Sequence, residues 1–129
     1  MSRMNAYDFG ALAATANVPA VPPPIRKPAA AATIPILTSD VEVGIDTRPS
    51  AVTVQLPSVV AWSNQNKSGL DLMIIDYFGD AAAHNITPSL FAGDTFTYGG
   101  VTPVIRSNFG HLALRPDPSV PTWLVIGVN

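Results

Sequence analysis

The stretch at residues 74–88, IIDYFGDAAAHNITP, poses the question on which the fold of this chain depends. It begins with an apolar run, passes through Asp76, Gly79 and Asp80, and ends in a short alternation of apolar and polar residues. His84, one of only two histidines in the chain, lies within a few residues of both aspartates. The stretch therefore indicates either a catalytic or metal site, or a turn between two strands.

The pattern favours the turn. Gly-Asp is a turn-forming pair, and on a β-hairpin Asp76 and His84 would face each other across the two strands. A catalytic or metal site needs a third group with a defined role, and no His-x-His or His-x-x-x-His spacing supplies one. The other histidine, His111, alternates with leucines in a separate segment. We expect no metal site and interpret both histidines as hairpin or interface residues.

Most of the chain has the pattern of an all-β domain. From Val41 onward, short alternating or apolar runs are separated by clusters of Gly, Pro, Asn, Asp and Ser. The expected strands are Val41–Ile45, Ala51–Leu56, Leu70–Phe78, His84–Thr87, Thr95–Tyr98, Val101–Ser107, His111–Arg115 and Trp123–Val128. About eight strands without a helical period predict an antiparallel β-sandwich or barrel over residues 41–129.

Residues 1–40 have a different composition. They contain six of the 13 prolines and an alanine run at residues 29–32. Because each proline fixes φ and removes a backbone donor, we expect an extended arm that is ordered only by contacts with a partner. Near its tip, Tyr7, Phe9 and Leu12 form a small apolar group. We interpret these three as anchors in pockets of another chain, with a disordered tail as the alternative.

The overall composition indicates a protein that binds other protein subunits. Of the 129 residues 47% are hydrophobic and only 12% are charged, about half the usual charged share. A soluble monomer normally has a more charged surface, so we expect other subunits to cover part of this one. The net charge of −2 provides no basic stripe for nucleic acid. Because the sequence also has no apolar run long enough for a membrane span, we expect a protein made in the cytoplasm.

Patterns of enzyme chemistry are missing from the sequence. There is no Gly-x-Ser-x-Gly motif and no cysteine. Glu42 is the only glutamate, and most aspartates that could pair with it for glycoside hydrolysis adjoin turn residues. The Gly99-Gly100 pair is not followed by the helix and lysine of a phosphate-binding loop. We therefore expect neither enzyme activity nor a cofactor.

Four aromatic residues are candidates for an interface. Trp62 and Trp123 each adjoin an expected apolar strand, Val59–Ala61 or Leu124–Ile126. Such tryptophans commonly pack in a core or a subunit interface, although they could also stack on sugar rings. Tyr77 and Phe78 follow the apolar run of the opening stretch, and we include them among the candidate interface residues.

Several of these segments together resemble the β-sandwich module of structural proteins in tailed-bacteriophage virions. They are AVTVQLP (51–57), LDLMIIDYFGDAAAHNITP (70–88), FTYGG (96–100), SNFGHLALR (107–115) and TWLVIG (122–127). The likeness covers about residues 51–127, and Tyr77-Phe78 replaces the small polar pair that is usual in the family. The matching positions are Val52, Val54, Leu56, Ile75, Asp76, Gly79, Ala81, Asn85, Ile86, Thr87, Phe109, Gly110, Leu112, Leu114 and Trp123.

This resemblance implies adhesion rather than catalysis. Members of the group serve as capsid decoration (cement) proteins, head fibres, tail-fibre segments and baseplate parts. One module with one long arm implies a cement protein on the capsid exterior of the virion, a homotrimer that bridges subunits of the major capsid protein. The alternatives are a tail-fibre or baseplate adaptor that binds a tail protein, and a carbohydrate-binding β-sandwich that uses Trp62 or Trp123.

Overall fold

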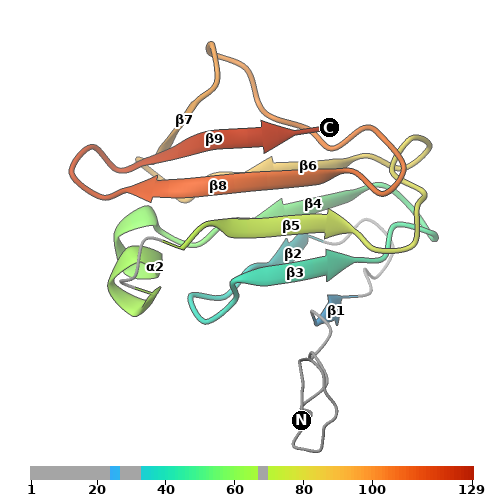
Figure 1. Cartoon of the computed structure of the whole chain (residues 1–129), viewed down its shortest axis with the longest axis horizontal. Coiled ribbons are helices and arrows are strands. Elements are labelled where there is room, and N and C mark those ends of the chain that lie inside the picture. Colours follow the sequence, from blue (N-terminus) through green and yellow to red (C-terminus); the bar gives the residue numbers. More distant parts are fainter. Residues whose placement is uncertain (1–23, 27–32, 67–69) are drawn as a thin grey trace, which may run out of the picture.

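A computed structural model describes residues 24–26, 33–66 and 70–129 of the chain. Strands dominate this part, with one short helix (Figure 1). The elements are β1 (Ile25–Arg26), β2 (Thr33–Pro35), β3 (Glu42–Ile45), β4 (Val52–Gln55), α2 (Val59–Asn66), β5 (Leu72–Asp76), β6 (Ile86–Ser89), β7 (Thr95–Thr97), β8 (His111–Asp117) and β9 (Thr122–Val128). The expectation of a mainly β fold is confirmed.

The strands form two sheets that pack around one core. The larger sheet has six strands in the order β1-β3-β5-β8-β9-β7, and the smaller has three in the order β2-β4-β6. In Figure 1 the smaller sheet lies behind the larger one. Both sheets end in edge strands and do not close on themselves, so the arrangement is a sandwich and not a barrel.

The prediction that the strands of this sandwich pair antiparallel is wrong. Among the described strands, five of the seven pairings are parallel, and only β5·β8 and β8·β9 are antiparallel. From β1 to β6 the chain alternates between the two sheets. Because it crosses over after every strand, it re-enters each sheet in the same direction and lies parallel to the previous strand of that sheet.

Residues 74–88 are consequently not a hairpin. β5 belongs to the larger sheet and β6 to the smaller, so residues 77–85 form a corner between the sheets. β6 also continues through Pro88, beyond the expected end at Thr87. Pro88 in β6 and Pro35 in β2 both lie in edge strands, where a missing backbone donor removes no ladder bond, whereas the central β4 has no proline.

Two other segments differ from the sequence-based expectation. The expected strand Val101–Ser107 contributes only an isolated bridge between Ile105 and Ile86. The expected strand at Val59–Ala61 is the first turn of α2. Two side chains cap this turn: Ser58 Oγ accepts the Ala61 N–H at 3.2 Å, and the Asp94 carboxylate accepts the Val59 N–H at 2.9 Å.

The two tryptophans are buried in the core beside α2. Trp62 comes from α2 and Trp123 from β9, and their rings meet edge to face with centroids 5.5 Å apart. They are 1% and 0% exposed. The indole Nε1 of Trp62 donates to the Asp40 carbonyl at 2.7 Å. Through this packing α2 closes one end of the sandwich.

The core also includes residues that we expected in the arm. Ile34 and Ile36 are buried in it, and the Ile36 N–H donates to the Gln55 carbonyl at 2.8 Å. Arg26 forms an ion pair with the buried carboxylate of Asp40. Residues 33–40 therefore pack with the body, because Thr33–Leu37 alternates exposed and buried positions with Pro35 on an exposed one. The remainder of the expected arm, residues 1–23 and 27–32, lies outside the described residues.

This packing predicts that Ile34→Ala and Ile36→Ala each lower the free energy of unfolding by about 2–5 kcal/mol, because each removes buried methyl groups from the core. Leu37→Ala is the control, since Leu37 is adjacent but 49% exposed, and we expect a change within about 0.5 kcal/mol. Urea denaturation measures all three variants. Unfolding midpoints equal to that of the parent for both isoleucine variants would show that β2 is not part of the core.

Candidate functional site

The structure separates the candidate interface residues into two groups. Tyr77 and Phe78 are exposed at the corner that follows β5. Trp62 and Trp123 are fully buried, so neither can contact a partner or stack on a sugar ring; as interface residues they are corrected to core residues. The expected anchors Tyr7, Phe9 and Leu12 lie outside the described residues.

The corner that carries Tyr77 and Phe78 is organised by the buried carboxylate of Asp76. One of its oxygens accepts the Gly79 N–H at 3.2 Å, and the other accepts the Ala81 N–H at 2.9 Å and the Phe109 N–H at 3.0 Å. The first two donors belong to the corner, and the third belongs to the loop that precedes β8. Asp76 therefore joins two loops that are 33 residues apart in sequence.

Phe109, in the loop before β8, is unusual both in the exposure of its side chain and in its backbone conformation. Its side chain is 69% exposed, the highest value among the large hydrophobic residues that the structure describes. Its φ of 58° lies in the left-handed region, which a phenylalanine rarely adopts. The Phe109 ring covers Gly79, where an added Cβ would come within 2.4 Å of it. A strained backbone that presents an aromatic ring to solvent is a pattern found at functional sites.

Tyr77 and Phe78 pack beside a paired arginine. Their rings meet edge to face with centroids 5.1 Å apart, and Cζ of Arg48 lies 3.6 Å from the centre of the Phe78 ring. Arg48 donates two side-chain hydrogen bonds to Asp46, at 3.0 and 2.9 Å. Tyr77 lies over Gly44, where an added Cβ would approach Cδ1 of the tyrosine to 2.9 Å.

Arg48 supplies a permanent positive charge beside these two aromatic rings. The hydrogen bonds that Asp46 accepts raise the pKa of Arg48 above its ordinary value, although partial desolvation acts in the opposite direction. Arg48 is therefore positively charged throughout the physiological pH range. Its guanidinium contacts Asp46 on one side and the Phe78 ring on the other.

We call the surface made by Arg48, Tyr77, Phe78 and Phe109 the end patch. It lies at the end of the sandwich away from α2, where β3 and β5 finish and β8 begins (Figure 1). Rigid aromatic rings beside a positioned arginine bind another protein surface well, because they bury a large area with little loss of side-chain entropy. The end patch combines three exposed aromatic rings with one arginine.

Two of the four end-patch residues, Tyr77 and Phe78, were predicted from the sequence as interface residues. Arg48 and Phe109 were not. An available signal for Phe109 was a large apolar residue inside the turn cluster Asn108–Gly110, where the other residues are turn formers. No signal in the local sequence pointed to Arg48, because its contact with Phe78 joins two loops that are distant in sequence.

The histidine at the centre of the opening stretch has a local partner. His84 Nδ1 lies 2.8 Å from the Asp80 carboxylate, and both side chains are partly exposed. The hairpin geometry predicted Asp76 opposite His84, but His84 bonds to Asp80 and the Asp76 oxygens accept backbone N–H groups. Within residues 24–26, 33–66 and 70–129, no three His, Cys, Asp or Glu side chains come together in a group that could hold a metal ion.

In the same ranges, the structure contains no helix with the length and apolar character that a membrane span requires.

Comparisons with known proteins give no family for this chain. It matches no protein-family model and no curated protein sequence.

The role of Asp76 predicts that Asp76→Asn lowers the free energy of unfolding by about 1–3 kcal/mol. The amide keeps the shape but replaces an acceptor oxygen with a donor group that faces a backbone N–H. Asp71→Asn is the matched control, since Asp71 forms a solvent-exposed ion pair with Arg115 that contributes about 1 kcal/mol or less. Equal urea midpoints for the two variants would contradict the structural role of Asp76.

Proposed function

We propose that this chain is a structural virion protein of a tailed bacteriophage, and in particular a capsid decoration protein on the outside of the shell. Its partners would be the major capsid protein and copies of itself, as a homotrimer. It would stabilise the shell by bridging neighbouring capsid subunits. The proposal combines the sequence resemblance over about residues 51–127 with the surface of the sandwich.

The observation that carries the proposal is the end patch. Tyr77, Phe78 and Phe109 are exposed, yet each packs against a neighbour: Tyr77 on Gly44, Phe78 on Arg48 and Phe109 on Gly79. Aromatic residues and arginines dominate the binding energy of protein interfaces. Because these side chains already pack against neighbours, docking them costs less conformational entropy than docking side chains with no contacts.

The remainder of the described surface is consistent with a subunit that is covered by others. Several large apolar side chains are about half or more exposed: Leu37, Phe91, Val101, Val120 and Ile126. A single contact of ordinary size buries about 1,600 Å² in total and can be of modest strength. In an oligomer, several such contacts with one shell act together, so the overall attachment is much stronger than each contact alone.

The second candidate function is a tail-fibre or baseplate adaptor, in which the end patch would dock to a tail protein. The number of copies in purified virions separates the two functions. A decoration protein is distributed over the whole shell in many copies, whereas an adaptor is present in the few copies that one tail can hold. The carbohydrate-binding alternative based on Trp62 or Trp123 is not proposed further, because both side chains are buried.

The end patch predicts that Phe109→Ala weakens attachment to capsids by roughly 30-fold, which corresponds to an anchor worth about 2 kcal/mol. The matched control is Phe91→Ala. Phe91 is 50% exposed and lies in the turn whose Asp94 caps α2, at the other end of the sandwich. Occupancy is measured by gel densitometry of capsids that lack the protein, after titration with each variant and removal of the unbound fraction.

A second series tests the proposed arm anchors. Substitution of Tyr7, Phe9 and Leu12 together by alanine is expected to reduce capsid occupancy further without changing the urea midpoint. If neither this variant nor Phe109→Ala decorates less than the parent and Phe91→Ala, the attachment does not use these residues, and the proposed mode of adhesion is wrong.

A further inference from the structure

The two sheets differ in the composition of their outer faces, which point away from the core. In the smaller sheet, the outward residues that alternate with buried ones are Thr33, Pro35, Thr53, Gln55, Thr87 and Ser89. The strand register places them in two rows across the sheet, one of three threonines and one of the other three residues. Apart from the proline all six are polar, which is typical of a sandwich face that meets water.

The outer face of the larger sheet is more apolar. In β5 residues 72–75 are all apolar, and Met73 and Ile75 are the two that face outward. A continuous apolar run is typical of a strand that is covered on both faces. Met73 lies opposite Ala113 of β8 in the strand register. Ala113 is only 6% exposed although it does not belong to the core cluster, so side chains of the outer face already pack over it.

A β-bulge adds a further apolar side chain to this face. Ala113 pairs with Gly127 and Leu114 with Val125, which leaves Ile126 between them without a partner on β8. Val125 packs against the core, whereas Ile126 is 48% exposed and faces outward. Bulges commonly re-aim a side chain in this way. We call the resulting apolar surface the outer patch: Met73, Ile75, Ala113 and Ile126.

The charged side chains of this face lie toward α2. Arg115 forms an ion pair with Asp71, which precedes β5, and Glu42 begins β3. Both strands run away from α2 toward the end patch (Figure 1). In the half of the face beside the end patch, the polar exception is His111, whose Nε2 would lie 3.3 Å from a Cβ added at Gly127. The outer patch therefore occupies the less charged half.

The outer patch is continuous with the end patch through Tyr77. Gly44 faces outward between the core residues Val43 and Ile45, and it lies opposite Ile75 in the strand register. The Tyr77 ring lies over Gly44, where an added Cβ would approach Cδ1 of the tyrosine to 2.9 Å. One end-patch residue is thus packed on the outer face beside Ile75. The two patches form one surface, on the side of the larger sheet that faces away from the smaller sheet.

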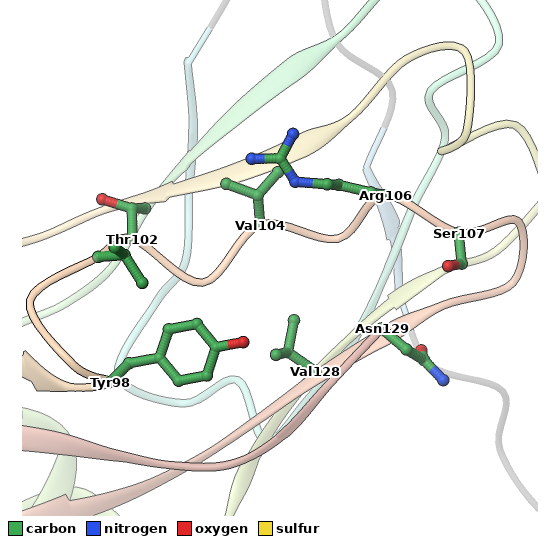
Figure 2. A pocket seen from close by; sticks show the side chains of 8 residues that line it. Tyr98, Thr102, Val104, Arg106, Ser107, Val128 and Asn129 are labelled. Atoms are coloured by element: carbon green, nitrogen blue, oxygen red, sulfur yellow. The ribbon is translucent and has the colours of Figure 1, made fainter.

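The shape of this surface suits a protein partner better than a small ligand. A pocket of about 490 Å³ lies beside it, between the loop at residues 98–107 and the end of β9 (Figure 2). Its lining includes Val128, which packs against the core, and none of the four outer-patch residues. Small molecules bind in concave sites, whereas protein interfaces cover broad surfaces. A broad protein surface is therefore the partner that fits the outer patch.

We propose that the major capsid protein covers the outer patch together with the end patch. The sandwich then lies flat on the shell, with its larger sheet inward and its smaller sheet toward solvent. This inference rests on the proposed function and adds the orientation of the sandwich. The contrast between the two outer faces selects the covered side. The position of Tyr77 selects the partner, because a protein that buries this ring also reaches the neighbouring Ile75.

Cysteine labelling tests this orientation directly, because the chain has no cysteine of its own. Ile126→Cys is compared with Thr53→Cys, an outward position in the middle strand of the smaller sheet, in the free protein and on capsids. Mass spectrometry of this chain follows the reaction with a maleimide. On capsids we expect Ile126→Cys to react roughly tenfold more slowly, because a contact that excludes water also excludes the reagent. The rate for Thr53→Cys is expected to stay the same.

Charge substitutions test the same contact through affinity. Ile126→Glu and Ile126→Lys are both expected to weaken attachment by about 30-fold or more, because each places an unpaired charge in an apolar contact. Thr53→Glu and Thr53→Lys are the matched controls and are expected to bind as the parent does. Urea midpoints and sedimentation velocity of the free variants show that each is folded and keeps the oligomeric state of the parent.

Some results would overturn this inference alone. If Phe109→Ala weakens attachment while the Ile126 variants bind as the parent and Ile126→Cys reacts as in the free protein, the end patch is the whole contact. Protection of Thr53→Cys instead of Ile126→Cys would show the opposite orientation. Loss of binding in Ile126→Glu but not in Ile126→Lys would indicate charge repulsion and not burial. A changed oligomeric state of these variants would show that another copy covers the outer patch.

Failure of the proposed function gives a different result. In that case the parent chain itself does not bind to capsids that lack the protein, and this inference fails with it, since it assigns the outer patch to the capsid protein.

Discussion

The carboxylate of Asp76 is the constraint on which the end patch depends. A buried, charged carboxylate is very unfavourable unless hydrogen bonds replace its hydration. Here three backbone N–H groups do so, and they come from both sides of the same surface. Because one residue bonds to both the corner after β5 and the loop before β8, Phe109 is held beside the corner of Tyr77 and Phe78. The strained φ of Phe109 is compatible with this bond, which compensates part of its cost.

The winding of the chain explains why the four end-patch residues meet. β3 and β5 are parallel neighbours, so the segments that follow them, with Arg48 and Phe78, emerge at the same end of the larger sheet. β8 is antiparallel to β5, so the segment that precedes it, with Phe109, begins at that end as well. If β3 and β5 were antiparallel neighbours, they would finish at opposite ends of the sheet, and the contact between Arg48 and Phe78 would be lost.

The sequence predicted the strands better than their arrangement. Alternation along β3, β4 and β5 indicates which residues face the core, but it says nothing about which strand lies next to which. The turn clusters were recognised, yet a turn and a corner between sheets use the same residue types, and only the long-range pairing distinguishes them. β2 was missed because Pro35 and the prolines that precede it in sequence outweighed the alternation of Ile34 and Ile36. α2 was missed because two turns with two buried residues show little periodicity.

Among the residues of the candidate surface, those with a local signal in the sequence could be predicted, and those placed by long-range contacts could not. Tyr77 and Phe78 could be predicted because two aromatic residues directly after an apolar strand are unusual in a turn. Arg48 and Phe109 become part of the surface only through contacts between segments that are distant in sequence. The burial of Trp62 and Trp123 likewise follows from their contact across the core, which their local sequence left open between core, interface and ligand site.

The proposed decoration of a capsid requires that the end patch contacts the shell. The most direct measurement is a cryo-electron microscopy reconstruction of the virion that carries this chain, at a resolution that shows aromatic side chains. We expect the sandwich on the capsid exterior with Tyr77, Phe78 and Phe109 buried against the major capsid protein. A reconstruction in which the sandwich is bound to the capsid while these three side chains face solvent, or in which it is absent from the shell, would contradict it.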